Sequence, residues 1–79
     1  MVNLYPNPCN HGFNLEWKEK FTASTVKVYD VNGKLVVQVE WNNDKTLTLN
    51  VDNLPNCIYF VNIETIGNDK ITRRLLINR

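Results

Sequence analysis

Residues 25–41 have the sequence TVKVYDVNGKLVVQVEW. Apolar side chains recur at every second position on both sides of the central Asp-Val-Asn-Gly, which is the period of a β-strand with one buried face. The dipeptide Asn32-Gly33 supplies two residues that readily adopt positive φ, and it predicts a tight type I′ turn. The stretch is therefore a β-hairpin. The apolar row expected on its second strand consists of Leu35, Val37, Val39 and Trp41.

The same period of two continues toward both ends of the chain, and no segment has the period of an amphipathic helix. Pro6 and Pro8 end a short first strand, because each proline lacks a backbone donor and fixes φ. Residues 57–65 are apolar on both faces at their start, which predicts a central strand. Arg73 interrupts the apolar row of the last strand and favours a sheet edge. The predicted strands span residues 2–5, 12–17, 25–30, 34–41, 46–51, 57–65 and 70–78.

Seven short strands joined by tight turns predict an all-β fold. A single flat sheet would leave its apolar rows with nothing to pack against, whereas two sheets packed face to face bury them. We therefore predict an immunoglobulin-like β-sandwich of seven antiparallel strands. Leu54-Pro55 followed by Tyr59 predicts a tyrosine corner, in which a buried tyrosine hydroxyl is hydrogen-bonded to a nearby loop.

The composition is that of one small globular domain. The chain has 79 residues, of which 43% are hydrophobic, and a formal net charge of +1. The apolar content argues against disorder, and the near-balanced charge gives no reason to expect nucleic acid as a partner. No apolar run approaches the length of a membrane helix, and residues 1–6 lack the features of a signal peptide. These observations leave two alternatives: the chain is cytoplasmic, or it was cut from a longer precursor whose far end holds the export signal.

Few residues could support catalysis or bind a metal. His11 is the single histidine. It lies two residues from Cys9, but a catalytic Cys–His pair also needs a pocket and an orienting group, and neither is evident. Together with Cys57 these residues give three zinc ligands, whereas a structural zinc site needs four. We therefore predict no catalytic, cofactor-binding or metal-binding residues and no small-molecule substrate.

The two cysteines leave two alternatives open. If Cys9 and Cys57 lie at the same end of the sandwich, they could form a disulfide. In the chain-entropy model, closing a loop of about 49 residues stabilises the fold by roughly 4 kcal/mol in an oxidising compartment. The other alternative is two independent, small, buried side chains.

The aromatic residues also have two interpretations. Some of them could form a platform on which a sugar stacks, as in carbohydrate-binding sandwiches. Trp17 and Trp41 each continue an apolar row, however, which favours packing in the core or at its rim. The aromatic residues in question are Tyr5, Trp17, Phe21 and Trp41.

Three stretches of the sequence, taken in order, resemble one known family. They are Leu4-Tyr5-Pro6-Asn7-Pro8 with Gly12-Phe13 after it, VKVYDVNGKLV at residues 26–36, and LPNCIYFV at residues 54–61. Their order and spacing, with a Lys/Arg-rich final strand, are similar to the type A C-terminal sorting domain of the type IX secretion system of Bacteroidetes. The resemblance covers essentially the whole chain.

The resemblance implies that residues 1–79 are a single immunoglobulin-like sorting domain, excised from a larger secreted precursor. An N-terminal signal peptide would take such a precursor to the periplasm, where the outer-membrane translocon recognises the folded domain. A sortase-like cysteine protease usually removes the domain, and the upstream cargo reaches the cell surface or the medium. A weak homodimer through an edge strand is left open. The alternative functions are a carbohydrate-binding module or a structural spacer of a secreted bacterial enzyme.

The resemblance also implies roles for particular residues. The family usually has a small residue after Tyr-Pro-Asn-Pro and glycine after Leu-Pro-x. Here both positions are cysteine, Cys9 and Cys57, which suggests that they pair. The motif residues are expected mainly to hold the fold: Tyr5, Pro6, Asn7, Pro8, Gly33, Leu54, Pro55 and Tyr59. The translocon is expected to recognise exposed basic residues near the end of the chain: Lys70, Arg73, Arg74 and Arg79.

Overall fold

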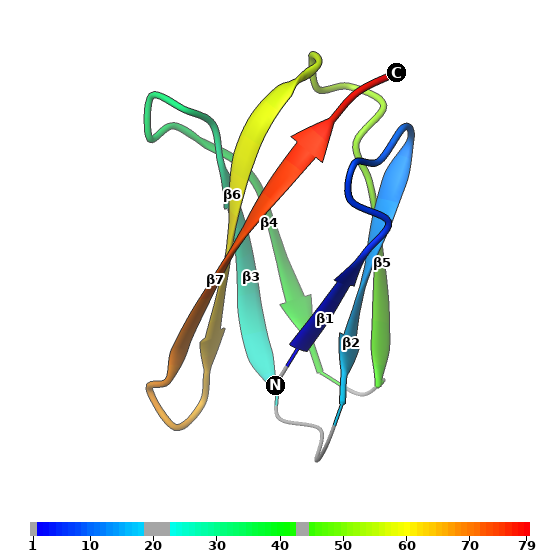
Figure 1. Cartoon of the computed structure of the whole chain (residues 1–79). Coiled ribbons are helices and arrows are strands. Elements are labelled where there is room, and N and C mark those ends of the chain that lie inside the picture. The colour runs from blue at the N-terminus through cyan, green and yellow to red at the C-terminus, as the bar shows by residue number, and fades with distance from the viewer. Residues whose placement is uncertain (1, 19–22, 43–44) are drawn as a thin grey trace.

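The computed structural model describes residues 2–18, 23–42 and 45–79 and contains two antiparallel sheets that face each other (Figure 1). One sheet has the strand order β1-β2-β5, and the other has the order β4-β3-β6-β7. The strands are β1 (Val2–Tyr5), β2 (Gly12–Trp17), β3 (Ser24–Tyr29), β4 (Leu35–Trp41), β5 (Thr46–Asn50), β6 (Cys57–Thr65) and β7 (Lys70–Ile77). The predicted all-β sandwich of seven strands is confirmed. The central position of β6 and the edge position of β7 are confirmed as well.

The hairpin between β3 and β4 forms as predicted, but its turn type is different. Gly33 has a φ of 83°, whereas Asn32 has no positive φ. Gly33 N donates to Asp30 O at 3.0 Å, and Asp30 N donates to Lys34 O at 2.9 Å. These bonds close a three-residue loop in which Gly33 forms a bulge. The type I′ prediction is wrong because the Asp30 carboxylate accepts hydrogen bonds from two turn amides, Asn32 N and Lys34 N.

A second irregularity, between Val28 and Tyr29 in the pairing of β3 with β4, shifts the register of β4 and moves one predicted core residue to the surface. Val28 is paired with Val37, but Tyr29 is paired with Leu35, so that Val36 is the extra residue. Val36 and Val37 both pack against the core. Leu35 is 43% exposed, which corrects its predicted place at the start of the apolar row.

The core lies between the two sheets and is built from alternate residues of each strand. At the end of the sandwich where β1 begins, Trp17 of β2 and Trp41 of β4 stack across the gap between the sheets. Their ring centroids are 5.1 Å apart, and the angle between the ring planes is 23°. Both rings are buried, with 4% and 1% of their residue surface exposed, so the prediction of core packing is confirmed.

Two positions in the fold have backbone demands that few residues meet. Gly12 lies so close to β5 that a Cβ atom built on it would be 2.7 Å from Leu49 O. In the turn between β6 and β7, Asn68 N donates to Thr65 O at 3.0 Å. Asn68 has a φ of 69° there, which asparagine tolerates better than other residues with a side chain.

Candidate functional site

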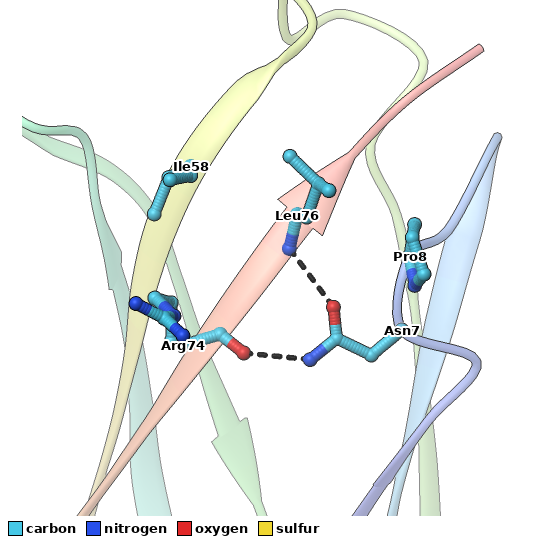
Figure 2. A pocket seen from close by; sticks show the side chains of 5 residues that line it. All are labelled: Asn7, Pro8, Ile58, Arg74 and Leu76. Carbon is cyan, nitrogen blue, oxygen red and sulfur yellow. Dashed lines mark hydrogen bonds between the residues drawn. The ribbon is translucent and has the colours of Figure 1, made fainter.

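The Tyr-Pro-Asn-Pro segment connects the two sheets at the free edge of β7. Asn7 Nδ2 donates to Arg74 O at 2.8 Å, and Leu76 N donates to Asn7 Oδ1 at 3.0 Å (Figure 2). Cys9 N then donates to Leu76 O at 2.9 Å, and Asn78 N donates to Cys9 O at 2.9 Å. The side-chain amide of Asn7 therefore replaces a backbone peptide group as the partner of β7. Because the neighbouring prolines have no N–H, this amide supplies the donor that the segment otherwise lacks.

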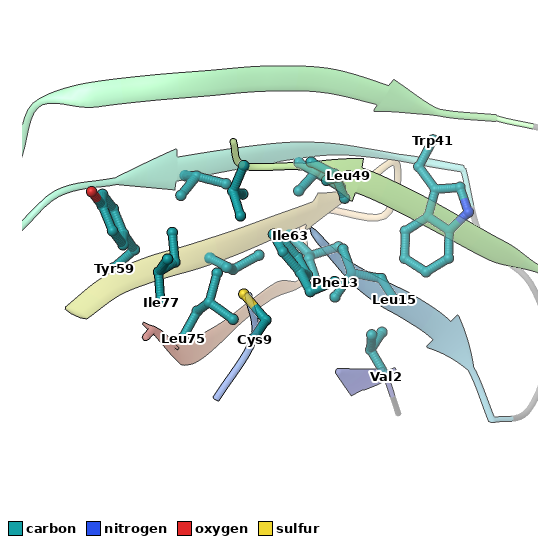
Figure 3. Close-up of a cluster of buried hydrophobic side chains, with 14 of the residues drawn as sticks. Val2, Cys9, Phe13, Leu15, Trp41, Leu49, Tyr59, Ile63, Leu75 and Ile77 are labelled. Carbon is teal, nitrogen blue, oxygen red and sulfur yellow. The ribbon is translucent and has the colours of Figure 1, made fainter. Parts of the chain in front are cut away.

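The two cysteines are free thiols separated by a strand. Cys9 forms a β-bridge with Ile77 along the edge of β7 that faces away from β6. Cys57, in β6, is paired with the same Ile77 along the opposite edge. Two strand spacings amount to about 9.5 Å, whereas a disulfide needs Cα atoms within about 7 Å. The predicted disulfide is therefore not formed, because β7 lies between its two partners. Cys9 is a core residue beside Leu75 and Ile77 (Figure 3).

The predicted tyrosine corner is present. Tyr59 is buried, and its hydroxyl donates to Pro55 O at 2.7 Å. Burial raises the pKa of the Tyr59 hydroxyl. Leu54, in the same loop, packs against the core, and its backbone N donates to Val51 O at 2.9 Å.

The side chain of Arg79 is bonded to this loop. Its guanidinium donates to Leu54 O at 2.7 Å, to Asn56 Oδ1 at 3.2 Å and to Val51 O. Its backbone N also donates to Asn56 Oδ1 at 3.2 Å. Arg79 therefore connects the end of the chain to the loop that holds the tyrosine corner.

The four basic residues that the translocon is expected to recognise lie in different surroundings. Lys70 and Arg74 are on the outer face of β7, and Lys70 Nζ is 3.9 Å from Glu64 Oε2. Arg73 faces the inner side, as its pairing with the buried Val61 shows, and its Nη1 donates to Thr72 O at 3.1 Å. Among the residues that the structure describes, the Arg74 guanidinium has neither a hydrogen bond nor an ion pair.

The outer face of β6 and β7 is apolar at the end of the sandwich near the C-terminus. Ile58 is paired with Leu76, and Phe60 lies between Tyr29 and Arg74. A groove of about 380 Å³ lies on this face (Figure 2). Its lining residues are Asn7, Pro8, Ile58, Arg74 and Leu76. We refer below to Tyr29, Leu35, Ile58, Phe60 and Leu76 as the outer apolar face.

The outer apolar face is not among the features predicted above, although the sequence carries a signal for it. Residues 57–61 are apolar at successive positions, so both faces of the strand are apolar. That pattern predicts a central strand, and β6 is one. Since one face of this strand packs in the core, the same pattern also implies an apolar row on the outside.

Cys9 and His11 are not arranged for catalysis. Burial raises the pKa of the Cys9 thiol, which disfavours the nucleophilic thiolate. The exposed His11 side chain instead meets Asp52, with Nδ1 and Oδ1 2.7 Å apart, and this hydrogen bond holds the pKa of Asp52 below its usual value. Within residues 2–18, 23–42 and 45–79, no group of three or more His, Cys, Asp or Glu side chains could hold a metal ion. The same residues form no helix able to cross a membrane.

The tryptophans that would form a carbohydrate platform are inside the molecule. Trp17 and Trp41 are buried and stack on each other, so neither presents a ring face to a sugar. Tyr5 ends β1 and is 39% exposed, and Phe21 lies outside the described residues. No described contact therefore favours the carbohydrate-binding alternative.

A family model described as "Secretion system C-terminal sorting domain" matches residues 3–78. The chain belongs to this family. The chain is also 26% identical over 76 residues to an endo-acting ulvan lyase of Formosa agariphila, and 26% identical over 77 residues to an ulvan lyase of Nonlabens ulvanivorans. These matches cover 96% and 98% of the chain but only 14% of each lyase.

Among solved structures, the sorting domain is similar to a DUF3244 family protein from Bacteroides vulgatus with an immunoglobulin-like β-sandwich fold. The TM-score is 0.82 at 14% identity, and the match covers 98% of this chain and 84% of that chain. This likeness confirms the immunoglobulin-like fold predicted from the sequence. The family confirms the predicted function: the domain is a C-terminal secretion signal for a cargo protein exported to the cell surface or the medium. A sorting-signal domain of this fold is not itself catalytic.

Proposed function

We propose that the folded domain is bound in the periplasm by the outer-membrane translocon of the type IX system, and that a sortase-like cysteine protease then separates it from an upstream cargo. The observation that carries the proposal is the family match over residues 3–78. The cargo would be a secreted enzyme, as the lyases that carry a similar segment are. The domain itself contributes only a surface to be bound, so the whole activity of the exported protein lies upstream.

The motif contacts support recognition of a folded surface rather than of a linear sequence. Asn7 is bonded to β7, Gly33 forms the bulge of the β3–β4 hairpin, and Tyr59 is bonded to Pro55. These residues are remote in sequence and are engaged in internal contacts. A partner that depends on them would therefore sense whether the sandwich has formed.

Within the predicted basic set, we propose that Lys70 and Arg74 contact the translocon directly. Both are exposed on the outer face of β7. Arg73 and Arg79 donate to backbone carbonyls, and Arg79 connects the chain end to the loop of the tyrosine corner. Their contribution to export would be mainly through the fold.

Export of a reporter tests the proposal. Residues 1–79 are fused to the C-terminus of a fluorescent protein with a signal peptide, and the fusion is expressed in a type IX-competent Bacteroidetes strain and in a translocon-null strain. Surface-accessible or released reporter is expected only in the competent strain, with the domain removed. Retention of a folded fusion in the periplasm of the competent strain would refute the proposal and would leave a spacer module.

The double variant Lys70→Gln, Arg74→Gln separates direct recognition from fold support. It is expected to lose export while its unfolding midpoint stays close to that of the wild type, because surface substitutions cost little stability. Arg79→Gln should instead lower the unfolding midpoint. Normal export of the folded double variant would contradict the direct role of these two residues.

We extend the proposal to a weak homodimer through β4. The outer edge of this strand has no partner strand in the described part of the chain. Unprotected edges are the usual place for another strand to add. Sedimentation equilibrium over a range of protein concentrations would show the dimer, and a constant monomer mass would refute it.

A further inference from the structure

We infer that the outer apolar face is a docking surface for a protein segment that presents an apolar side chain next to a carboxylate, with Arg74 as the charged anchor. This inference rests on the proposed function, because it assigns the segment to the protein machinery that binds the folded domain. It adds the chemistry of that partner and the part of the sandwich that meets it.

The first observation is the exposure of large apolar side chains on one contiguous face. Leu35, Ile58, Phe60 and Leu76 are 43%, 38%, 39% and 36% exposed. Pairing across β4, β3, β6 and β7 makes them neighbours. Four side chains exposed to this extent amount to roughly 300 Å², which is within the range of the largest apolar patches on monomers and is typical of interaction sites.

The second observation is the charge at the centre of this face. Arg74 is paired directly with Phe60, and its guanidinium is unpartnered among the described residues. Asp30, the nearest carboxylate in the adjoining hairpin, accepts hydrogen bonds from Asn32 N and Lys34 N. Among the described residues, this end of the face therefore has an unpaired cation and no unpaired carboxylate, so a partner carboxylate would form a charge-assisted hydrogen bond with Arg74.

The residues that line the groove indicate which side chains of a partner would fit into it. Pro8, Ile58 and Leu76 supply apolar walls, and Arg74 lies beside them (Figure 2). The Asn7 amide bonds β7 through both its oxygen and its nitrogen. Because Asn7 is engaged in this way, Arg74 is the side chain that gives the groove its polarity. An apolar side chain with an adjacent Asp or Glu matches this arrangement.

A second copy of the domain fits this face poorly. A two-fold dimer through the face would bring Arg74 of one copy toward Arg74 of the other, and like charges opposed in this way are destabilising. An anionic membrane fits poorly as well. Recognition of such a membrane relies on clusters of four to eight basic residues. Arg74 lies on this face with Lys34 in the adjoining hairpin, whereas Lys27 and Lys70, on the same side of the sheet, lie beside the Glu64 carboxylate.

The upstream cargo is also disfavoured as the occupant. Val2 is paired with Trp17 at the end of the sandwich where the N-terminus lies, whereas β7, which carries Leu76, ends at the opposite end near the C-terminus (Figure 1). A chain that precedes residue 2 would therefore leave the domain at the far end. The outer apolar face points away from that attachment and remains free for a partner in trans.

The experiment uses the reporter fusion with substitutions on the face and matched substitutions elsewhere. Arg74→Glu reverses the charge, and its control is Lys45→Glu, an exposed residue beside the other sheet. Phe60→Thr and Leu76→Thr remove apolar surface while keeping β-propensity, and their control is Ile66→Thr, which is 77% exposed in the turn between β6 and β7. Purified domains are checked by urea unfolding, so that only folded variants are compared.

The expected result is a loss of export of about tenfold or more for each face variant, with the controls at wild-type level. A photo-crosslinking residue at position 60 should capture a translocon component, and one at position 66 should not. Export of the wild type with unchanged export of the folded face variants would overturn this inference and the direct role of Arg74, while the proposed sorting function would stand. Failure of the wild type to be exported would overturn the inference together with the proposed function. The purified domain is also tested for binding to phosphatidylglycerol vesicles. If the wild type binds them and Arg74→Glu does not, the face would be assigned to lipid and the inference of a protein partner would be overturned.

Discussion

The Asn7 amide should make a measurable contribution to stability although it is on the surface. Asn7→Ala removes two hydrogen bonds to β7, from Asn7 Nδ2 to Arg74 O and from Leu76 N to Asn7 Oδ1. Each such bond contributes about 0.5–1.5 kcal/mol net. Water can reach the groups left behind, which favours the lower half of the sum. We expect a loss of about 1–2 kcal/mol, equivalent to a decrease in the unfolding temperature of several degrees.

Urea unfolding and amide hydrogen exchange check this expectation. The Leu76 amide should exchange faster in Asn7→Ala, because its acceptor is gone. Asn10→Ala is the control, since Asn10 is exposed in the same segment and its side chain has no described hydrogen bond. Equal stability of the two variants, with unchanged Leu76 exchange, would refute the reasoning.

Asn7→Asp separates the two bonds. The carboxylate keeps an acceptor for Leu76 N but faces Arg74 O without a proton to donate. At neutral pH this variant should be at least as unstable as Asn7→Ala. As the pH falls through about 4, protonation restores a donor, so the gap to the wild type should narrow. A gap that stays constant or widens on acidification would contradict a contribution from the bond to Arg74 O.

Three further variants follow from the fold. Tyr59→Phe loses the bond to Pro55 O and about 1 kcal/mol. Burial raises the pKa of Tyr59 in the folded state above 10.0, so the unfolded state ionises first as the pH rises. The free energy of unfolding of the wild type should therefore fall above pH 10. Urea unfolding from pH 7 to 11 should show a smaller fall for Tyr59→Phe. Gly12→Ala places a Cβ 2.7 Å from Leu49 O and should cost about 1–3 kcal/mol by thermal unfolding. Asn68→Ala, at a φ of 69°, should cost about 1 kcal/mol in the same assay, whereas Asn68→Gly should not destabilise.

The strands could be predicted because their signals are local. Alternation of apolar residues and the position of turn residues depend only on the sequence near them, and they place all seven strands to within one residue at each end. The turn type at Asn32-Gly33 was less predictable. It depends on whether the Asp30 carboxylate accepts the turn amides, which a dipeptide rule does not consider.

The candidate site was less predictable because it depends on register and on contacts between remote segments. Alternation alone places Arg73 and Arg74 on opposite faces of β7, so the expectation that both are exposed to the translocon conflicts with the strand period. The separation of Cys9 from Cys57 follows from the place of Ile77 between them, which requires the pairing of three segments. The hydrogen bonds of the Arg79 guanidinium depend on the directions in which the Val51 and Leu54 carbonyls point. No local sequence pattern encodes these directions.

The connection between residues 7–9 and β7 also determines how the domain would respond to mechanical force. β1 begins at one end of the sandwich, and the chain ends at the other (Figure 1). Residues 7–9 run parallel to β7 and are joined to it by bonds from Asn7 Nδ2, Leu76 N, Cys9 N and Asn78 N. A pull on the N-terminus against the C-terminus would load these bonds together, in shear, instead of opening them one after another. The domain would resist such a pull as a unit while its cargo is moved.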